Sequence, residues 1–196
     1  MGAFKDDPTP EERKGILKRL SSPRYYPVYL AAILISIATL PRVIFPGRSF
    51  YPNGVDEGID MMSGKMMAAG YSLYSQVNSV QPPLMLYLYG ILDLSPPAYR
   101  LLSTAASLII LGLIMYAGYR IGGKTVMVAA GAFLVMDVLF LHQSRLASLD
   151  MFSLIWVVFG VALLIRVRKK NERWAAALMG AAIGISVMTK LFGIIA

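Results

Sequence analysis

The sequence contains no cysteine and a single histidine, His142. The lack of cysteine excludes disulfide frameworks, thiolate metal sites and cysteine nucleophiles. One histidine cannot build a histidine cluster around a metal ion, and at a helix end it is typical of a polar interfacial residue. Any catalytic chemistry therefore has to come from carboxylates and basic side chains.

Charged residues are also scarce, at 15% of the 196 residues, whereas 57% are hydrophobic. The mean hydropathy of +0.60 is higher than expected for a soluble domain of this size. We therefore predict an all-α, polytopic integral membrane protein. A net charge of +8 would indicate nucleic acid as a partner of a soluble protein. In a membrane protein basic residues instead mark loops on one face, and no nucleic-acid partner is expected.

Crossing a bilayer takes roughly 20 apolar residues. Five segments approach that length: residues 25–45, 101–119, 125–141, 151–165 and 174–196. A shorter apolar segment, residues 82–94, is bracketed by prolines and predicts an interfacial or re-entrant helix. Apolar residues recur at helical spacing in residues 57–69, which predicts a second, amphipathic helix on the membrane surface.

The basic residues indicate how these segments are oriented. If residues 82–94 do not cross the membrane, then residues 1–24, 120–124 and 166–173 share one face and hold thirteen of the nineteen basic residues. Basic loops mark the cytoplasmic side. We therefore expect a cytoplasmic N-terminal segment (1–24) and a transmembrane module (25–196), with a first extracytoplasmic loop at 46–98. The last residues are apolar, so a fragment truncated at its C-terminal end is expected, and such a fragment can be inactive.

Three carboxylates, Asp56, Glu57 and Asp60, stand within five positions of that outer loop. Asp56 and Glu57 follow the turn signal "YPNG" and precede the amphipathic helix, so capping and the helix dipole explain them as readily as catalysis does. The functional interpretation is a general base acting on an acceptor hydroxyl, with a basicity raised by partial desolvation.

Several short motifs along the chain resemble those of a known enzyme family. The series "VDEG", "GYSLY", "QPPLMLYLYG" and "AYRLLS" resembles the first luminal loop and second span of the C-type (GT-C) glycosyltransferases. It is most similar to the dolichyl-phosphate-mannose protein mannosyltransferases and to bacterial aminoarabinose and lipopolysaccharide-core relatives. "SRLASLD" is similar to the Arg-containing turn after their third span, and "TKLFG" to the Lys-bearing end of a later span. The resemblance runs from about Ala31 to Gly193.

This resemblance implies a GT-C-like fold and an enzyme. The enzyme would move a mannose-like sugar, with inversion, from a polyprenyl or dolichyl monophosphate to a hydroxyl of a protein, glycan or lipid on the extracytoplasmic side. Asp56 would be the catalytic base, and Glu57 would orient substrate or hold a metal. The sequence assigns no metal site, but Mg²⁺ or Mn²⁺ at Asp56 and Glu57 suits the oxygen ligands. The alternative function is a non-enzymatic transporter or membrane-assembly subunit.

The resemblance places three further residues at the lipid phosphate: Arg145, Asp150 and Lys190. Each has a simpler explanation. Arg145 fits phosphate geometry, but it also fits a snorkelling residue or a partner of Asp150. Asp150 opens the fourth predicted span, as a helix cap does. Lys190 lies in an apolar segment, where a base is a functional candidate, and Asp137 would be costly in its span without a partner or a wet cavity.

Overall fold

The computed structural model describes residues 29–30, 33–34, 37–38, 40, 55–170 and 173–190. The predicted cytoplasmic segment and most of the first predicted span lie outside these residues. The helices in the described chain are α3 (Val55–Ala68), α4 (Pro83–Leu92), α5 (Pro96–Met136), α6 (Val138–Gln143), α7 (Leu149–Lys170) and α8 (Arg173–Thr189). The described residues contain no β-strand beyond an isolated bridge between Leu73 and Val77, so the all-α prediction is confirmed.

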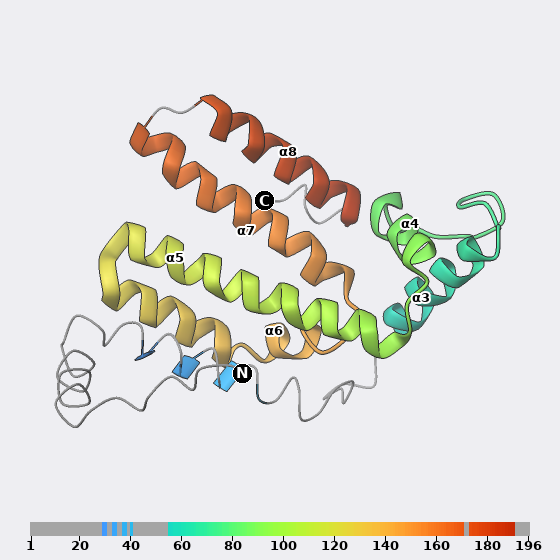
Figure 1. Cartoon of the computed structure of the whole chain (residues 1–196), viewed down its shortest axis with the longest axis horizontal. Helices are drawn as coiled ribbons and strands as arrows, with labels where there is room; N and C mark the ends of the chain where they lie inside the picture. Colours follow the sequence, from blue (N-terminus) through green and yellow to red (C-terminus); the bar gives the residue numbers. More distant parts are fainter. Residues whose placement is uncertain are drawn as a thin grey trace, which may run out of the picture.

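Helix α5 is a hairpin of two helical arms, which Figure 1 shows running back alongside one another. The backbone leaves helical geometry at Gly122 and Gly123, and Gly123 has φ 74° and ψ −156°, a region open essentially to glycine alone. A β-carbon on Gly118 would lie 3.0 Å from the carbonyl oxygen of Val126, so the arms also need a small residue where they meet. The reversal falls in the predicted turn 120–124.

The third predicted span, residues 125–141, does not form one continuous helix. Its helix ends at Met136, and α6 begins after Asp137. The carboxylate of Asp137 accepts a hydrogen bond from the backbone N–H of Phe140 at 2.6 Å, which caps α6. Asp137 is exposed and does not line the cavity described in the next subsection.

Helix α7 packs against both α5 and α8, and Figure 1 shows it between them. The hydroxyls of Ser153 on α7 and Ser186 on α8 lie 2.8 Å apart, and both residues are buried. Small polar residues of this kind let apolar helices approach closely and satisfy their own hydrogen bonds. Lys190, directly after α8, is held by this packing at the same end of the molecule as Asp150.

Helices α3 and α4 form a separate pair beside this end of the bundle (Figure 1). They correspond to the two surface helices predicted at 57–69 and 82–94. A β-carbon on Gly64 would lie 2.6 Å from Cβ of Tyr89, so a glycine is required where the two helices cross. This close approach holds Glu57 of α3 and Tyr89 of α4 above the bundle.

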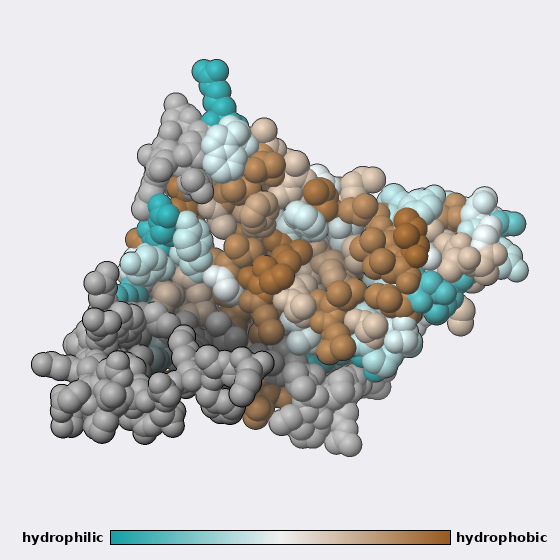
Figure 2. All heavy atoms as spheres, viewed as in Figure 1, coloured by the Kyte–Doolittle hydropathy of each residue, from teal (hydrophilic) through white to brown (hydrophobic). Residues whose placement is uncertain are grey.

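Among the described helices, α5 is long and apolar enough to cross a membrane, judged by length and composition. The apolar part of α7, Leu149–Ile165, and α8 are shorter. Figure 2 shows hydrophobic side chains gathered over the middle of the molecule, with hydrophilic residues toward its ends. This distribution is the one expected of a helical protein in a bilayer.

Candidate active site

Residues 144–149, which are the connection between α6 and α7 together with the first residue of α7, are all buried. Connections normally lie on the surface, because their backbone N–H and C=O groups need hydrogen-bond partners. Here α5 supplies two of them: Thr104 Oγ1 donates to the carbonyl of Ser144 at 3.1 Å, and Ser103 Oγ accepts from the N–H of Ser148 at 3.2 Å. We call residues 144–149 the buried loop.

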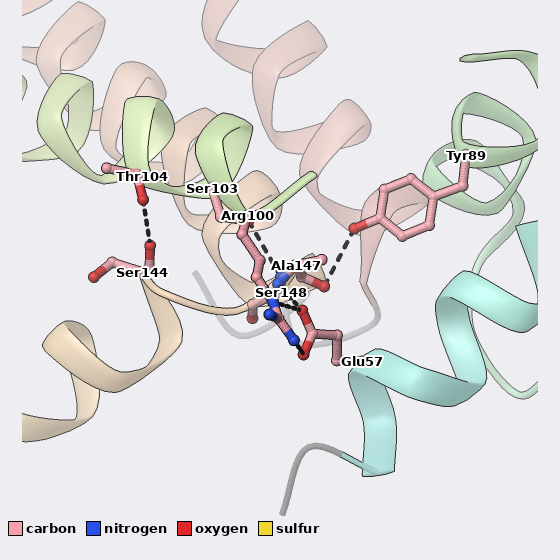
Figure 3. A network of polar contacts seen from close by, with 8 residues as sticks. All are labelled: Glu57, Tyr89, Arg100, Ser103, Thr104, Ser144, Ala147 and Ser148. Carbon is pink, nitrogen blue, oxygen red and sulfur yellow. Dashed lines mark hydrogen bonds and ion pairs between the residues drawn. The ribbon is translucent and has the colours of Figure 1, made fainter. Parts of the chain in front are cut away.

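Glu57 contacts the buried loop through its carboxylate (Figure 3). Its Oε1 accepts the backbone N–H of Ala147 at 2.8 Å. Arg100, in the first turns of α5, donates from Nε to Oε1 at 2.8 Å and from Nη2 to Oε2 at 3.0 Å. The side chain of Glu57 is 8% exposed and that of Arg100 is 30% exposed. A bidentate guanidinium and a backbone donor together compensate the burial of the carboxylate.

Helix α4 contacts the buried loop through a pair of tyrosines. Tyr89 donates its hydroxyl to the carbonyl of Ala147 at 3.2 Å, and Tyr99 donates its hydroxyl to the carbonyl of Tyr89 at 2.8 Å. The two rings are tilted, with centroids 4.3 Å apart, which is a favourable aromatic arrangement. Burial raises the pKa of Tyr89, so its hydroxyl stays protonated as a donor. The backbone of Ala147 is thus held at both its N–H and its C=O.

The buried loop forms one wall of a small cavity of about 40 Å³, which has room for a few water molecules. The charged residues that line it come from three parts of the chain: Asp56, Glu57 and Asp60 from α3, Asp150 from α7, and Lys190 after α8. Nζ of Lys190 lies 2.7 Å from Oδ1 of Asp150. Carboxylates and an ammonium group therefore meet in one place, although α3 and Lys190 are far apart in the sequence.

Asp60 is the most buried of the acids that line the cavity, with 5% of its surface exposed. Its pKa is raised to about 6, first by desolvation and then by the negative charges of Asp56 and Asp150, while the positive charge of Lys190 acts in the opposite direction. The geometry follows from helix periodicity, because residues four apart lie on one helix face. Asp60 therefore stands one turn below Asp56 on the side of α3 that faces the cavity.

Four of the five predicted site residues line this cavity: Asp56, Glu57, Asp150 and Lys190. Asp56 is exposed. The fifth, Arg145, lies in the buried loop, is 4% exposed and is not among the residues that line the cavity. His142 lies in the last turn of α6, at a helix end as the sequence suggests, and is buried at 6% exposure.

The described residues contain no group of three or more His, Asp or Glu side chains arranged to hold a metal ion. Both oxygens of Glu57 already accept hydrogen bonds from Arg100, and one also accepts from Ala147. The two predicted metal ligands, Asp56 and Glu57, are therefore not set up as a pair. A cation at these residues stays a prediction of the sequence.

Sequence reasoning assigned no site role to Arg100 or Tyr89, and it grouped Asp60 with Asp56 and Glu57 without giving it a separate role. Arg100 stands in the motif "AYRLLS", and a lone arginine at the start of an apolar segment was a signal that a carboxylate partner lies nearby. Asp60 follows Asp56 by four residues, so a shared helix face was readable. Nothing in the sequence indicates that Tyr89, rather than the other tyrosines of this region, contacts the buried loop.

The chain was compared with known protein families, curated proteins and solved structures. The family model described as dolichyl-phosphate-mannose-protein mannosyltransferase matches residues 65–196. No curated protein and no solved structure matches the chain. The matched region includes α4 to α8, the buried loop and Lys190, while Asp56, Glu57 and Asp60 lie just before it.

The contacts of Glu57 predict a large stability effect. We expect Glu57→Gln to lower the free energy of unfolding by roughly 2–3 kcal/mol, because the partly buried Arg100 guanidinium loses its charged partner. The matched control is Asp93→Asn, which breaks an exposed ion pair with Lys65 and should cost less than about 1 kcal/mol. Thermal unfolding in detergent, followed by intrinsic fluorescence, measures both. Equal effects of the two variants would contradict the assigned role of Glu57.

The raised pKa of Asp60 predicts a pH dependence of stability. Since its pKa is about 6 in the folded chain and 3.8 ordinarily, the folded chain keeps a proton between these values that the unfolded chain has lost. This contribution is complete below about pH 4 and is lost as the pH rises through about 6, a difference of roughly 1–3 kcal/mol. In Asp60→Asn the midpoint temperature of unfolding should change less between pH 4.5 and 7 than it does in the control Asp93→Asn. An unchanged slope in Asp60→Asn would show that another group titrates.

Proposed function

Because the chain belongs to the dolichyl-phosphate-mannose-protein mannosyltransferase family, we propose that it transfers a mannosyl residue from a polyprenyl monophosphate donor of the dolichyl type to a hydroxyl group of a protein. The observation that supports this most directly is the cavity that brings Asp56 to the Lys190–Asp150 pair. A base for the acceptor and a cation for the donor phosphate are the two groups this transfer needs. Family membership favours a glycosyltransferase over the transporter or assembly subunit.

In the proposed reaction Asp56 is the general base. It takes the proton of the acceptor hydroxyl as the hydroxyl oxygen forms a bond to the anomeric carbon. The bond between that carbon and the phosphate oxygen breaks on the opposite face, so the configuration inverts and no covalent enzyme intermediate forms. The electron pair of the broken bond stays with the polyprenyl phosphate, which leaves with one more negative charge. The exposure of Asp56 supports this role, because the acceptor arrives from water.

Lys190 is the proposed partner of the leaving phosphate. Its side chain is 14% exposed and pairs with Asp150, so the ammonium is already in place before the donor binds. A fixed cation stabilises the developing phosphate charge more than it stabilises the bound donor, which lowers the barrier. The buried loop places Arg145 two residues from Ala147, and we keep Arg145 as a second candidate for the phosphate on the strength of the family motif alone.

Glu57 acts in this proposal as a positioning residue. Its carboxylate is occupied by Arg100 and by the N–H of Ala147, so it is not the base. It ties the first turn of α3, which carries Asp56, to the wall of the cavity. Removing this tie would move the base relative to Lys190, and a shift of about 1 Å at a reacting centre is enough to cost about a hundredfold in rate.

We place the reaction on the extracytoplasmic side, with the N-terminal segment in the cytoplasm. The support is the charge distribution: the reversal of α5, at residues 120–124, and the C-terminal end of α7 both carry basic residues in the sequence. Both lie at the opposite end of the bundle from α3 and from the start of α7 (Figure 1). Basic residues of this kind mark the cytoplasmic face. The donor's lipid tail would lie in the bilayer beside α5, α7 and α8, with its phosphate at the level of Lys190.

The role of Asp56 is tested by transfer itself. Membranes that contain the full chain are given labelled polyprenyl-phosphate mannose, and label in protein is counted for the wild type, Asp56→Asn and the exposed-carboxylate control Asp93→Asn. We expect Asp56→Asn to reduce transfer at least about a hundredfold, because a general base is lost, and Asp93→Asn to keep it. Equal transfer by Asp56→Asn at equal expression would remove Asp56 from the mechanism. A wild type without transfer would refute the proposed donor.

A further inference from the structure

A second hollow adjoins the cavity that holds Lys190. It has a volume of about 180 Å³ and shares Asp56 and Asp60 with the first cavity. Its far wall is the segment just before α4, which includes Asn78 and Gln81. Asp56 and Asp60 therefore stand between two spaces, one on the side of Lys190 and one on the side of residues 78–81.

This hollow continues along α3 into a third, of about 350 Å³, with which it shares Ile59 and Asn78. The third hollow is more apolar, because Met62, Met66 and Val77 line it. We call the two together the α3 groove. It has a polar end at Asp56 and Asp60 and an apolar continuation between α3 and residues 76–78.

The wall opposite α3 is held in a defined conformation. Tyr74 donates its hydroxyl to the carbonyl of Gln81 at 2.7 Å and its backbone N–H to the carbonyl of Val77 at 2.9 Å. Tyr74 adopts φ 68°, which is uncommon for a residue with a large side chain and is kept only where surrounding contacts enforce it. The N–H of Ser72 donates to the side-chain oxygen of Gln76 at 2.8 Å. The amide side chains at this wall are thus presented by an ordered segment.

The cavity at Lys190 and the α3 groove differ in the charges of the residues that line them. Lys190 and Asp150 line the first cavity but not the α3 groove, so an anionic phosphate finds its cation on the first side. The groove end instead carries two carboxylates. Asp60 is only 5% exposed and lines both spaces, so the accessible part of its carboxyl faces them. There it can accept a hydrogen bond from a ligand or from water.

We propose that the α3 groove binds the acceptor as an extended peptide, with a serine or threonine hydroxyl at Asp56 and an apolar neighbouring side chain over Ile59 and Met62. This inference rests on the proposed function and adds the place and the sequence preference of the acceptor. Peptide N–H groups supply donors for Asp60, and the amides of Asn78 and Gln81 can both donate to and accept from a peptide backbone.

Two other occupants fit the lining less well. A glycan acceptor is usually held by stacking on aromatic rings, and no aromatic side chain lines the groove among the described residues. The bilayer would cover an open helix face, whereas here residues 76–81 wall one side and two carboxylates close one end. Ile59 and Met62 are 53% and 62% exposed, so their apolar surface is available to a ligand.

The test uses the purified full chain in lipid nanodiscs, with saturating polyprenyl-phosphate mannose and two capped pentapeptides. Both peptides have a central threonine, flanked by leucines in one and by glycines in the other. We expect the leucine peptide to have a KM about five- to tenfold lower, since it alone covers Ile59 and Met62. Met62→Asn should remove this difference, and Asn78→Ala should raise the KM of both peptides. The KM of the donor should stay unchanged in each variant.

Matched controls come from residues outside the groove. Met136→Asn changes an exposed methionine at the end of α5, and Ser75→Ala changes an exposed residue of the segment that carries Asn78; both should keep the wild-type KM values. The wild type can transfer mannose while Met62→Asn and Asn78→Ala leave the peptide KM values unchanged. This outcome would overturn the groove as the acceptor site, and the proposed function would stand. If the peptide KM values are unchanged and Met62→Asn also unfolds at a lower temperature in nanodiscs than in detergent, the groove is overturned and this face is assigned to the bilayer.

A binding measurement without donor separates the groove from the chemistry. The leucine peptide, carrying a benzophenone in place of one leucine, is irradiated with the chain, and the attachment site is mapped by mass spectrometry. Attachment within residues 59–66 or 76–81 supports the groove even if no mannose is transferred, in which case the proposed function alone fails. Attachment elsewhere, or none, overturns the groove.

Discussion

The hydrogen bonds that Glu57 makes to Arg100 and to the backbone of Ala147 are the interaction on which the candidate site depends. They join α3, α5 and the buried loop at one point, across 43 and 90 residues of sequence. A buried carboxylate without these partners would be strongly unfavourable, and a buried loop without them would keep an unpaired N–H. The three groups therefore satisfy one another, and α3, α5 and the buried loop meet at this point.

The hydrogen bonds of Glu57 explain why the neighbouring acids on α3 have different surroundings. Glu57 points into the protein and is fully occupied, while Asp56, one residue earlier, stays exposed at the mouth of two cavities. Asp60, one turn later, faces the same cavities from a buried position. The three acids have different surroundings because successive helical residues point about 100° apart. Glu57 therefore contacts the protein, Asp56 is exposed to water, and Asp60 faces the cavities from a buried position. The proposed transfer uses this arrangement, with phosphate on the side of Lys190 and the hydroxyl on the side of Asn78.

Much of the fold was readable from the sequence, because helices depend on local periodicity and length. The helices predicted at 57–69 and 82–94, the glycine turn between the first and second arms of α5, and the apolar stretches of α7 and α8 all appear where the pattern predicts them. The end of the third predicted span was misplaced, because hydropathy does not register a capping aspartate such as Asp137 inside an apolar segment. The meeting of Asp56, Asp150 and Lys190 was expected from topology and from motif order, and the structure brings these three together. The partner of Glu57 and the contact of Tyr89 were not predicted, since tertiary pairing over tens of residues leaves no local signal in a single sequence.

The most direct test of this account is hydrogen–deuterium exchange at the backbone N–H of Ala147, compared between the wild type and Glu57→Gln. If the carboxylate holds the buried loop in place, this amide is protected in the wild type and its exchange rises at least about tenfold in the variant, while the amides in the middle of α7 keep their protection. If Ala147 exchanges equally slowly in both proteins, the loop is held by other contacts, and the site does not depend on Glu57.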